Sequence, residues 1–462
     1  MFRIPSGLQQ IIPPAAAKKV MELLHQPALT QAVKDAAHKL GWPEIQAPGQ
    51  LQEIWQQAKQ WMESTLSTGY NGSTINSAAL NATGLIFNSA MGGVPLPLGI
   101  ADQASRRLGY VTAQSINDHL RETLCQLTGS EDALVVSSIE HAIGLLNHLP
   151  QAADGWLIPR GDYLSWSDNA HLGNCLDIQG RSTISLGSIT HCSAQDYSNG
   201  LKGTKHGTLH LSPNSVSYPS STVPSYAAID LRQLKTSHPV VHVDLLFDGT
   251  LVDLENDTFP NTLVASRLNS GTSLVVLPGD RLLGGPACGI IVGKREFISS
   301  LRAAAQLLRV ELHPLLAAML LGVITQQADK TSWRQLPVGA MLSNGLGNLK
   351  DRARRLEFQI QAGEAVTACR IIEGTSPIGD HLWEKFSLPS VALEIELKDA
   401  EHWFRAVRQE KGVDVHVSRA GNVIQLHLRS IDPADDRLLA DLFPSAVPVT
   451  PTETVEPTHP QT

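Results

Sequence analysis

Short apolar runs alternate with amphipathic segments from about residue 79 onward. Six of these runs are candidate strands: 133–136, 156–158, 208–211, 240–243, 273–277 and 289–292. Continuous apolar strands separated by helices are typical of a mainly parallel sheet that is covered on both faces. Such sheets bind ligands at the carboxyl ends of their strands. We therefore expect a large α/β domain over residues 79–330.

The helices expected between these strands follow from the spacing of the apolar residues. In the segment 115–129 these residues recur at helical spacing, and Gly129 follows as a stop. Ser115 with Asp118 has the form of a capping box, which predicts that this helix begins at Ser115. Further helices are expected over 139–149 and 294–308.

Different patterns flank the α/β domain. Residues 1–78 carry apolar positions at helical spacing and predict a helical N-terminal leader. Residues 331–443 predict a small α+β C-terminal domain, with strands over 391–397, 413–418 and 423–428 and helices over 400–409 and 433–442. Residues 444–462 are rich in Pro and Thr and predict a disordered tail.

Composition narrows the function classes. Charged residues make up 17% and apolar residues 42% of the 462 residues, and the net charge is −8, which excludes a disordered chain and a generally basic nucleic-acid coat. No uncharged apolar stretch is long enough to span a membrane, and no apolar signal-peptide core is present, so we expect a cytoplasmic protein with no membrane or DNA partner. The five cysteines are far apart and predict neither disulfides nor a metal site.

The charge is unevenly distributed. Residues 281–355 hold eleven Lys and Arg against four Asp and Glu, a balance of +7, so the rest of the chain carries −15. Four cations near its end form either a solvated helix face or a patch for an RNA backbone: Lys350, Arg352, Arg354 and Arg355. Residues 1–60 hold six cations and four acids, which is a weak electrostatic case for tRNA.

The most informative stretch is LPGDRLLGGPACGIIVG at 277–293, where an apolar strand ends in Gly279-Asp280-Arg281 and a Gly-Gly-Pro turn leads to the next strand. It resembles the cofactor-lysine loop of the bacterial selenocysteine synthase family, the L-seryl-tRNA(Sec) selenium transferases. Other stretches resemble the same family in the same order: FRIPSGLQQI at 2–11, LNATGLIFNSAMGGVPLP at 80–97, LTGSEDALVV at 127–136, DLLFDGTLVDL at 244–254 and RVELHPLLAAMLLGVI at 309–324.

The resemblance implies a fold-type I transferase dependent on pyridoxal phosphate (PLP), assembled as a homo-oligomer. Its chemistry requires a lysine that forms an imine with PLP, a carboxylate on the pyridinium nitrogen, donors for the phosphate and cations for an anionic substrate. The position that matches the lysine is Arg281, whose guanidinium does not form an imine. Pro278 replaces a serine of the family, and Lys294 reads as a solvated helix-start charge.

The remaining site residues follow from the same resemblance. Asp244 matches the pyridinium carboxylate, with Asp248 as the weaker candidate; either residue alternatively caps a turn. Ser137 and Ser138 begin a helix and either bind the phosphate or simply cap the helix. We further expect Asp280, Gly284 and Gly285 to bind the cofactor. Arg309 is expected to bind the substrate anion.

Three functions remain open from the sequence. The first is a PLP-dependent selenium transferase acting on seryl-tRNA or a small amino acid. The second is a homologue without imine chemistry that binds an anionic metabolite or serves as an assembly partner. The third is a PLP-dependent lyase-like enzyme of amino-acid metabolism. Arg281 weighs against classical imine catalysis in the first and third.

Overall fold

The structure is a computed structural model that describes residues 78–107, 112–163, 165–167, 170–176, 182–188, 192–202, 205–211, 240–254, 259, 261–329, 332–380, 383–384 and 386–444. The leader predicted over 1–78 and the tail predicted over 444–462 lie almost wholly outside these residues. Contacts along the chain separate Met1–Ala78 from Ala79–Thr462, and the described elements belong to the second unit apart from Ala78, the first residue of strand β1.

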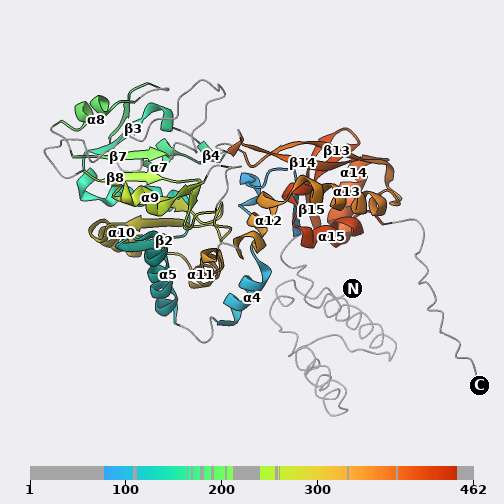
Figure 1. Cartoon of the computed structure of the whole chain (residues 1–462), viewed down its shortest axis with the longest axis horizontal. Helices are drawn as coiled ribbons and strands as arrows, with labels where there is room; N and C mark the ends of the chain where they lie inside the picture. Colours follow the sequence, from blue (N-terminus) through green and yellow to red (C-terminus); the bar gives the residue numbers. More distant parts are fainter. Residues whose placement is uncertain are drawn as a thin grey trace, which may run out of the picture. The chain divides into compact units, whose positions relative to one another are not determined.

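A seven-stranded sheet forms the first half of this unit, in the order β2-β12-β11-β8-β7-β3-β6. Its strands are β2 (Asp132–Val136), β3 (Gly155–Pro159), β6 (Ser182–Leu186), β7 (His206–Leu211), β8 (His242–Leu245), β11 (Leu274–Pro278) and β12 (Gly289–Gly293). All pairs are parallel except those of β12, which runs antiparallel to both β11 and β2. The expected mainly parallel α/β sheet is thereby confirmed (Figure 1).

Helices cover both faces of the sheet. On one face lie α6 (Ile139–Leu145), α7 (Leu172–Leu176) and α10 (Arg295–Leu308), and on the other α5 (Ala113–Thr128), α9 (Val264–Asn269) and α11 (Pro314–Ala328). The alternation along β11 divides the two cores, because Leu274 and Val276 pack on the first face while Val275 and Leu277 pack on the second. In Figure 1, α5 and α11 lie side by side below the sheet.

The start of α5 differs from the prediction. Thr112 is the N-cap and its hydroxyl accepts a hydrogen bond from the Ser115 N–H at 3.2 Å, so the capping box predicted for Ser115 with Asp118 is wrong. The two residues with short polar side chains, Thr112 and Ser115, are three positions apart, and the helix starts at the earlier one. Its end is as expected, because Gly129 takes a left-handed conformation with φ of 69°.

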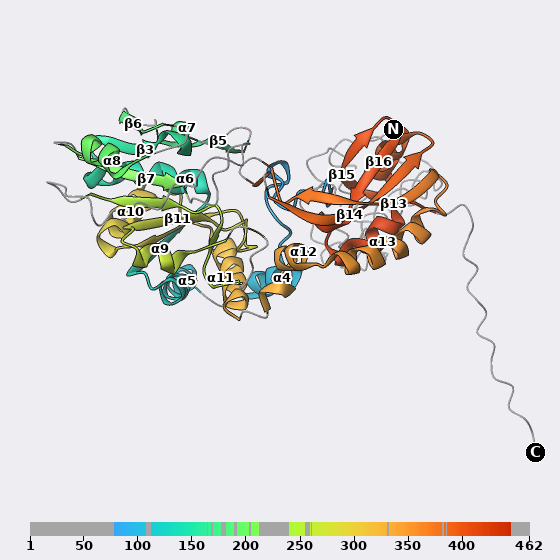
Figure 2. The ribbon, with the colours of Figure 1, turned by 45° about the horizontal axis from the view of Figure 1, so that its top comes forward.

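A second, five-stranded sheet has the order β1-β15-β16-β14-β13. It is built from β1 (Ala78–Ala82), β13 (Val366–Pro377), β14 (Ser387–Leu397), β15 (Val413–Ala420) and β16 (Val423–His427). The helices that belong with it are α13 (Leu346–Ile360), α14 (Ala400–Ala406) and α15 (Asp436–Asp441). The expected α+β architecture is confirmed, but β1 and β13 were not predicted. Figure 2 shows α13 beside β13 and β14.

The remaining elements are short: α4 (Leu98–Arg107), α8 (Ala194–Gly200), α12 (Pro337–Ser343), and the strand pairs β4 (Ser165–Ser167) with β5 (Ala170–His171) and β9 (Gly249–Thr250) with β10 (Thr262–Leu263). The buried core of the first sheet includes Met341 and Leu342 and extends to Leu388, whereas the core of the second begins with Leu80 and Ala82. The domain boundary at residue 330 stays a prediction. No helix among the described residues is long and apolar enough to cross a membrane.

Candidate functional site

Three strand ends meet at one edge of the large sheet. Pro278 at the end of β11 pairs with Gly289 at the start of β12, and Gly289 also pairs with Val136 at the end of β2. The loop that carries Arg281 and the turn that carries Ser137 therefore leave the sheet at the same edge, two strands apart. This is the edge at which parallel sheets bind ligands.

The loop after β11 is held in shape by its own backbone. The Gly285 N–H donates to the Gly279 carbonyl at 2.8 Å, and the Gly284 N–H donates to the Arg281 carbonyl at 2.9 Å. Gly284 has a φ of 67°, and a Cβ there would come within 2.5 Å of Val338 Cγ1. A Cβ on Gly285 would come to 2.9 Å from Leu320 Cδ1, so packing inside the fold also explains both glycines that the resemblance assigns to the cofactor.

Arg281 is held by its neighbour. Its Nη1 donates to Asp280 Oδ2 at 3.0 Å, and the two side chains are 12% and 16% exposed. The loop at Gly93 lies against this pair, because a Cβ on Gly93 would contact Asp280 Cβ at 3.0 Å. The structure therefore places a nearly buried guanidinium, paired with a single carboxylate, at the ligand edge of the sheet.

The two serines at the end of β2 serve the helix that follows them. Ser138 is the N-cap of α6 and accepts a hydrogen bond from the His141 N–H, and both serine hydroxyls lie within hydrogen-bonding distance of His141 Nδ1. The capping alternative is therefore confirmed for Ser138. The Ser137 N–H donates to the Val310 carbonyl at 2.9 Å, which brings this turn beside the exposed Arg309.

Asp244 is not at the strand end where the sequence places it. It lies inside β8 opposite Val275, three residues before Pro278 in register, and is 1% exposed. Its Oδ2 accepts hydrogen bonds from Arg267 Nε at 2.8 Å and Thr272 Oγ1 at 2.7 Å. Its Oδ1 is buried and has no partner among the described residues.

The structure thus gathers Arg281, Asp280, Ser137 and Ser138 at the edge, whereas Asp244 lies one residue before the end of β8 and pairs with Arg267. Its assignment as the pyridinium carboxylate stays a prediction. Asp248, the weaker candidate, is fully buried and its Oδ2 accepts a hydrogen bond from Thr262 Oγ1 at 2.7 Å.

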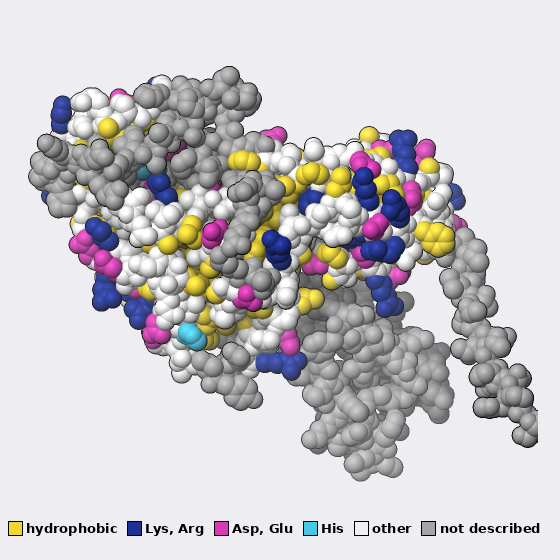
Figure 3. All heavy atoms as spheres, in the orientation of Figure 1, with side chains coloured by type: hydrophobic (Ala, Val, Ile, Leu, Met, Phe, Trp, Pro, Cys, Tyr) yellow, Lys and Arg dark blue, Asp and Glu magenta, His cyan; other side chains and the backbone are white. Residues whose placement is uncertain are grey.

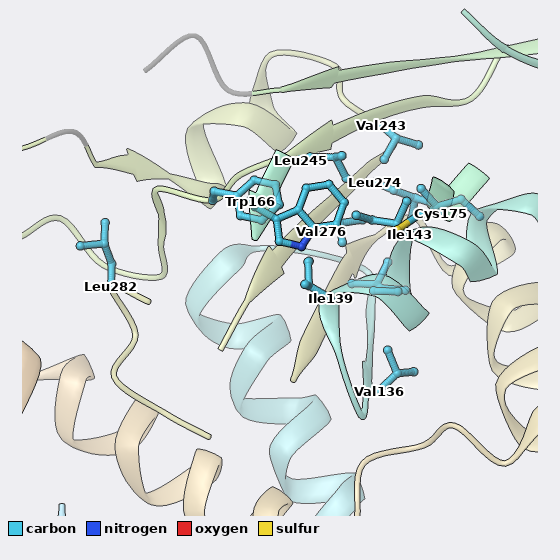
Figure 4. Packing of buried hydrophobic residues seen from close by; sticks show 14 of the residues in the cluster. Val136, Ile139, Ile143, Trp166, Cys175, Val243, Leu245, Leu274, Val276 and Leu282 are labelled. Carbon is cyan, nitrogen blue, oxygen red and sulfur yellow. The ribbon is translucent and has the colours of Figure 1, made fainter. Parts of the chain in front are cut away.

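An aromatic group that the sequence analysis did not single out lies on the α6 side of the sheet. Trp166 Nε1 donates to Glu140 Oε1 at 2.9 Å, and its ring lies 5.1 Å from that of Phe247. In Figure 4, the indole lies beside Val276 and Leu245. A single tryptophan in a polar stretch carries no periodic signal, and the partner that orients it is 26 positions away.

Comparison with known proteins identifies the family. The model of the family described as "SelA: L-seryl-tRNA selenium transferase" matches residues 107–430. This chain belongs to the L-seryl-tRNA selenium transferase family. It is 26% identical over 336 residues to the L-seryl-tRNA(Sec) selenium transferase of Geotalea daltonii, covering 69% of this chain and 72% of that protein. It is 24% identical over 382 residues to that of Carboxydothermus hydrogenoformans, covering 79% and 80%.

A solved structure has the same fold. D-glucosaminate-6-phosphate ammonia-lyase aligns with a TM-score of 0.56 at 12% identity, over 81% of this chain and 96% of that one. At this level of identity the likeness concerns the fold alone. The expected fold-type I architecture, with a large α/β part and a C-terminal antiparallel sheet, is confirmed.

The family is PLP-dependent, so the described residues can be tested against that cofactor. An imine requires a primary amine, and Arg281 offers none. Lys294 is exposed and follows Gly293, which pairs with Leu274, so it lies at the opposite edge of the sheet. Among the described residues, the ligand edge therefore does not fit PLP bound as a lysine imine.

Proposed function

We propose that this member of the selenium transferase family does not form an imine with PLP and instead binds an anionic small molecule non-covalently at Arg281. The observation that carries the proposal is the Asp280–Arg281 pair, a guanidinium that is 12% exposed at the ligand edge. Its hydrogen bonds to the described residues all start from Nη1, so Nε and Nη2 remain for an acceptor. A guanidinium offers such paired donors to a phosphate or carboxylate in one plane.

Other residues at the ligand edge favour the binding of an anion over the formation of an imine. Ser137 and the segment that carries Arg309 lie side by side, so a second cation is close to the same turn. Arg302, one of the cations counted in the positive stretch, is in contrast bound to Asp132. The positive balance of residues 281–355 thus supports binding at Arg281 and Arg309 more than a general attraction of anions.

Two substitutions of Arg281 test the proposal. We expect wild-type protein mixed with PLP to give no visible imine band and no adduct after borohydride reduction. Arg281→Lys restores an amine at the position and should give a reducible adduct, whereas the matched variant Arg281→Met should not. Arg281→Met should also weaken binding of inorganic phosphate by about 10-fold or more, because a charge-assisted hydrogen bond is lost.

The contrary result is equally clear. A borohydride-stable PLP adduct on the wild-type chain, mapped to a lysine by peptide mass spectrometry, would overturn the proposal and restore transferase or lyase chemistry. Phosphate binding that is unchanged in Arg281→Met would remove Arg281 from the anion site.

A further inference from the structure

A cavity of about 280 Å³ lies along the outer edge of β2, the terminal strand of the large sheet. Its floor is formed by Ala133, Leu134 and Val135, one wall by α5, and the other by α10 and the segment that follows it. The two helices cover opposite faces of the sheet, so the cavity is built across the edge of the strand. Its volume is close to the lower end of ordinary ligand pockets, about 300 Å³.

One of its two arginines is already occupied. Arg302 donates from both terminal nitrogens to Asp132, at 3.1 and 2.9 Å, and also to the Ala133 carbonyl at 2.9 Å. Asp132 is 3% exposed. Burial would raise the pKa of Asp132, but the hydrogen bonds from Arg302 and from the Ala133 N–H outweigh it and hold that pKa below its ordinary value. This pair is a fixed part of the wall.

The other arginine is not occupied in this way. Arg121 lies 3.8 Å from Asp118 and 3.6 Å from Asp132, both beyond hydrogen-bonding distance, and its side chain is 42% exposed. Asp118 accepts instead from Gln114 Nε2 at 3.1 Å. The Arg121 guanidinium therefore has donors for an acceptor that enters the cavity.

An exposed carboxylate, that of Glu311, lines the same cavity as Arg121. Glu311 is exposed, and among the described residues no hydrogen bond or ion pair engages its side chain, while its backbone is fixed by a bridge to Val136. With Asp132 behind the wall, two arginines face three carboxylates, a balance of −1 (Arg121 and Arg302 against Asp118, Asp132 and Glu311). A simple anion is therefore disfavoured, and a simple cation would leave Arg121 unmatched.

We propose that this cavity binds a free amino acid as its zwitterion, with the carboxylate on Arg121 and the ammonium on Glu311. The amides of Asn117 and Gln306, which line the same cavity, offer further donors and acceptors. Leu120, Leu134 and Leu312 also line the cavity, each less than 7% exposed, and offer apolar contacts to an aliphatic side chain. This proposal does not depend on the function proposed for Arg281.

Isothermal titration with three probes of one skeleton tests the charge requirement. The probes are L-leucine, 4-methylpentanoate, which lacks the ammonium, and 3-methylbutan-1-amine, which lacks the carboxylate. We expect saturable 1:1 binding of L-leucine at millimolar concentration and about 10-fold weaker binding of each of the other two, because each loses one charged contact.

Variants of the two charged ends assign the contacts. Arg121→Gln should weaken L-leucine binding by about 10-fold and abolish its advantage over the amine, and Glu311→Gln should do the same relative to the carboxylate. Glu296→Gln, an exposed change in the first turn of α10, should leave binding unchanged. Thermal melting of each variant verifies folding, and Glu311 is exposed, so its variant is expected to fold in any case.

Three results would overturn the proposal. These are no saturable binding of L-leucine to the wild-type chain, equal binding of the three probes, or L-leucine binding that is insensitive to both Arg121→Gln and Glu311→Gln.

Discussion

His210 and Asp244 form an unusual neighbouring pair in the large sheet. They lie opposite each other on β7 and β8; Asp244 is buried and His210 is half-buried. Each has one buried side-chain atom without a partner among the described residues, Nε2 of His210 and Oδ1 of Asp244. The other ring nitrogen of His210 is within hydrogen-bonding distance of the Tyr197 hydroxyl at 3.0 Å. Burial lowers the pKa of His210 to about 4, against the opposing effect of Asp244 and with a contribution from Arg267.

This shift predicts an acid sensitivity. A neutral buried histidine binds its proton less readily than the unfolded chain, so the free energy of unfolding should fall as pH decreases from about 6.5 to about 4 and level off below. His210→Gln should flatten this part of the curve by about 2–3 kcal/mol, measured by urea unfolding at several pH values. The same slope in wild type and variant would contradict the prediction. Exposed His402→Gln is the control.

The sequence predicted the positions of individual residues at the ligand edge more accurately than it predicted the contacts that those residues make. Arg281, Asp280 and Ser138 are where strand order and the Gly-Gly-Pro turn suggested. Asp244 lies one residue before the end of β8 rather than after the strand, and its contacts with Arg267 and Thr272 are not linked to it by any local pattern.

Elements were predicted where the apolar pattern is strong and local. The continuous runs of β3 and β11 were found because every residue in each strand is buried. β13 was not predicted, because its residues are mostly exposed or half-buried and form no continuous apolar run. The strand is instead stabilised by its long pairing with β14. The antiparallel direction of β12 was likewise not determined by its composition; it follows from a short connection after the Gly-Gly-Pro turn.

An ion pair joins helix α10 to β2, the terminal strand of the large sheet, and predicts an effect on stability. The Arg302 guanidinium on α10 pairs with the Asp132 carboxylate at the start of β2. Asp132→Asn should lower the free energy of unfolding by about 1–3 kcal/mol at neutral pH, because Arg302 is left without its carboxylate but is 28% exposed and partly screened.

The pH dependence of this effect has a definite sign. The folded pKa of Asp132 is lowered, so its contribution is present above the ordinary aspartate pKa and is lost as pH falls through the folded value. The difference between wild type and Asp132→Asn should therefore shrink in acid, as followed by chemical unfolding. A pH-independent difference would assign the effect to packing alone. Asp102→Asn, in an exposed ion pair, serves as control.

Across the described unit, several cations of the positive stretch are paired with carboxylates of the fold, and Arg352 is buried. Arg352 is 3% exposed and donates to Asp436 and to carbonyls of the turn after β16, so it belongs neither to a solvated face nor to an RNA patch. Lys350 pairs with Glu373, and Arg354 pairs with Asp351. Figure 3 accordingly shows cations interspersed with acids around the C-terminal sheet. The net charge of a sequence segment therefore did not predict the net charge that the segment exposes to solvent.

Arg429 predicts how the two cores of this unit unfold. It is 3% exposed, and it donates from Nη1 to the Met341 carbonyl on α12 at 2.9 Å and from Nε to the Pro389 carbonyl on β14 at 3.0 Å. Met341 packs in the core of the large sheet, whereas β14 belongs to the C-terminal sheet. Burial lowers the pKa of Arg429 to about 10, and its hydrogen-bond partners among the described residues are carbonyls rather than carboxylates. One side chain thus satisfies carbonyls that belong to two cores.

Arg429→Met should leave both carbonyls without donors and lower the free energy of unfolding by about 2–4 kcal/mol. Because the lost contacts join the two cores, we expect calorimetry to resolve two transitions where the wild-type chain shows one coupled transition for this unit. Arg370→Met, which removes an exposed ion pair within the C-terminal sheet, should leave the transition single. If Arg429→Met unfolds in one transition at an unchanged temperature, the cores are coupled by other contacts, and the hydroxyl of Ser430, which links Gly84 and Asn81, becomes the residue to substitute.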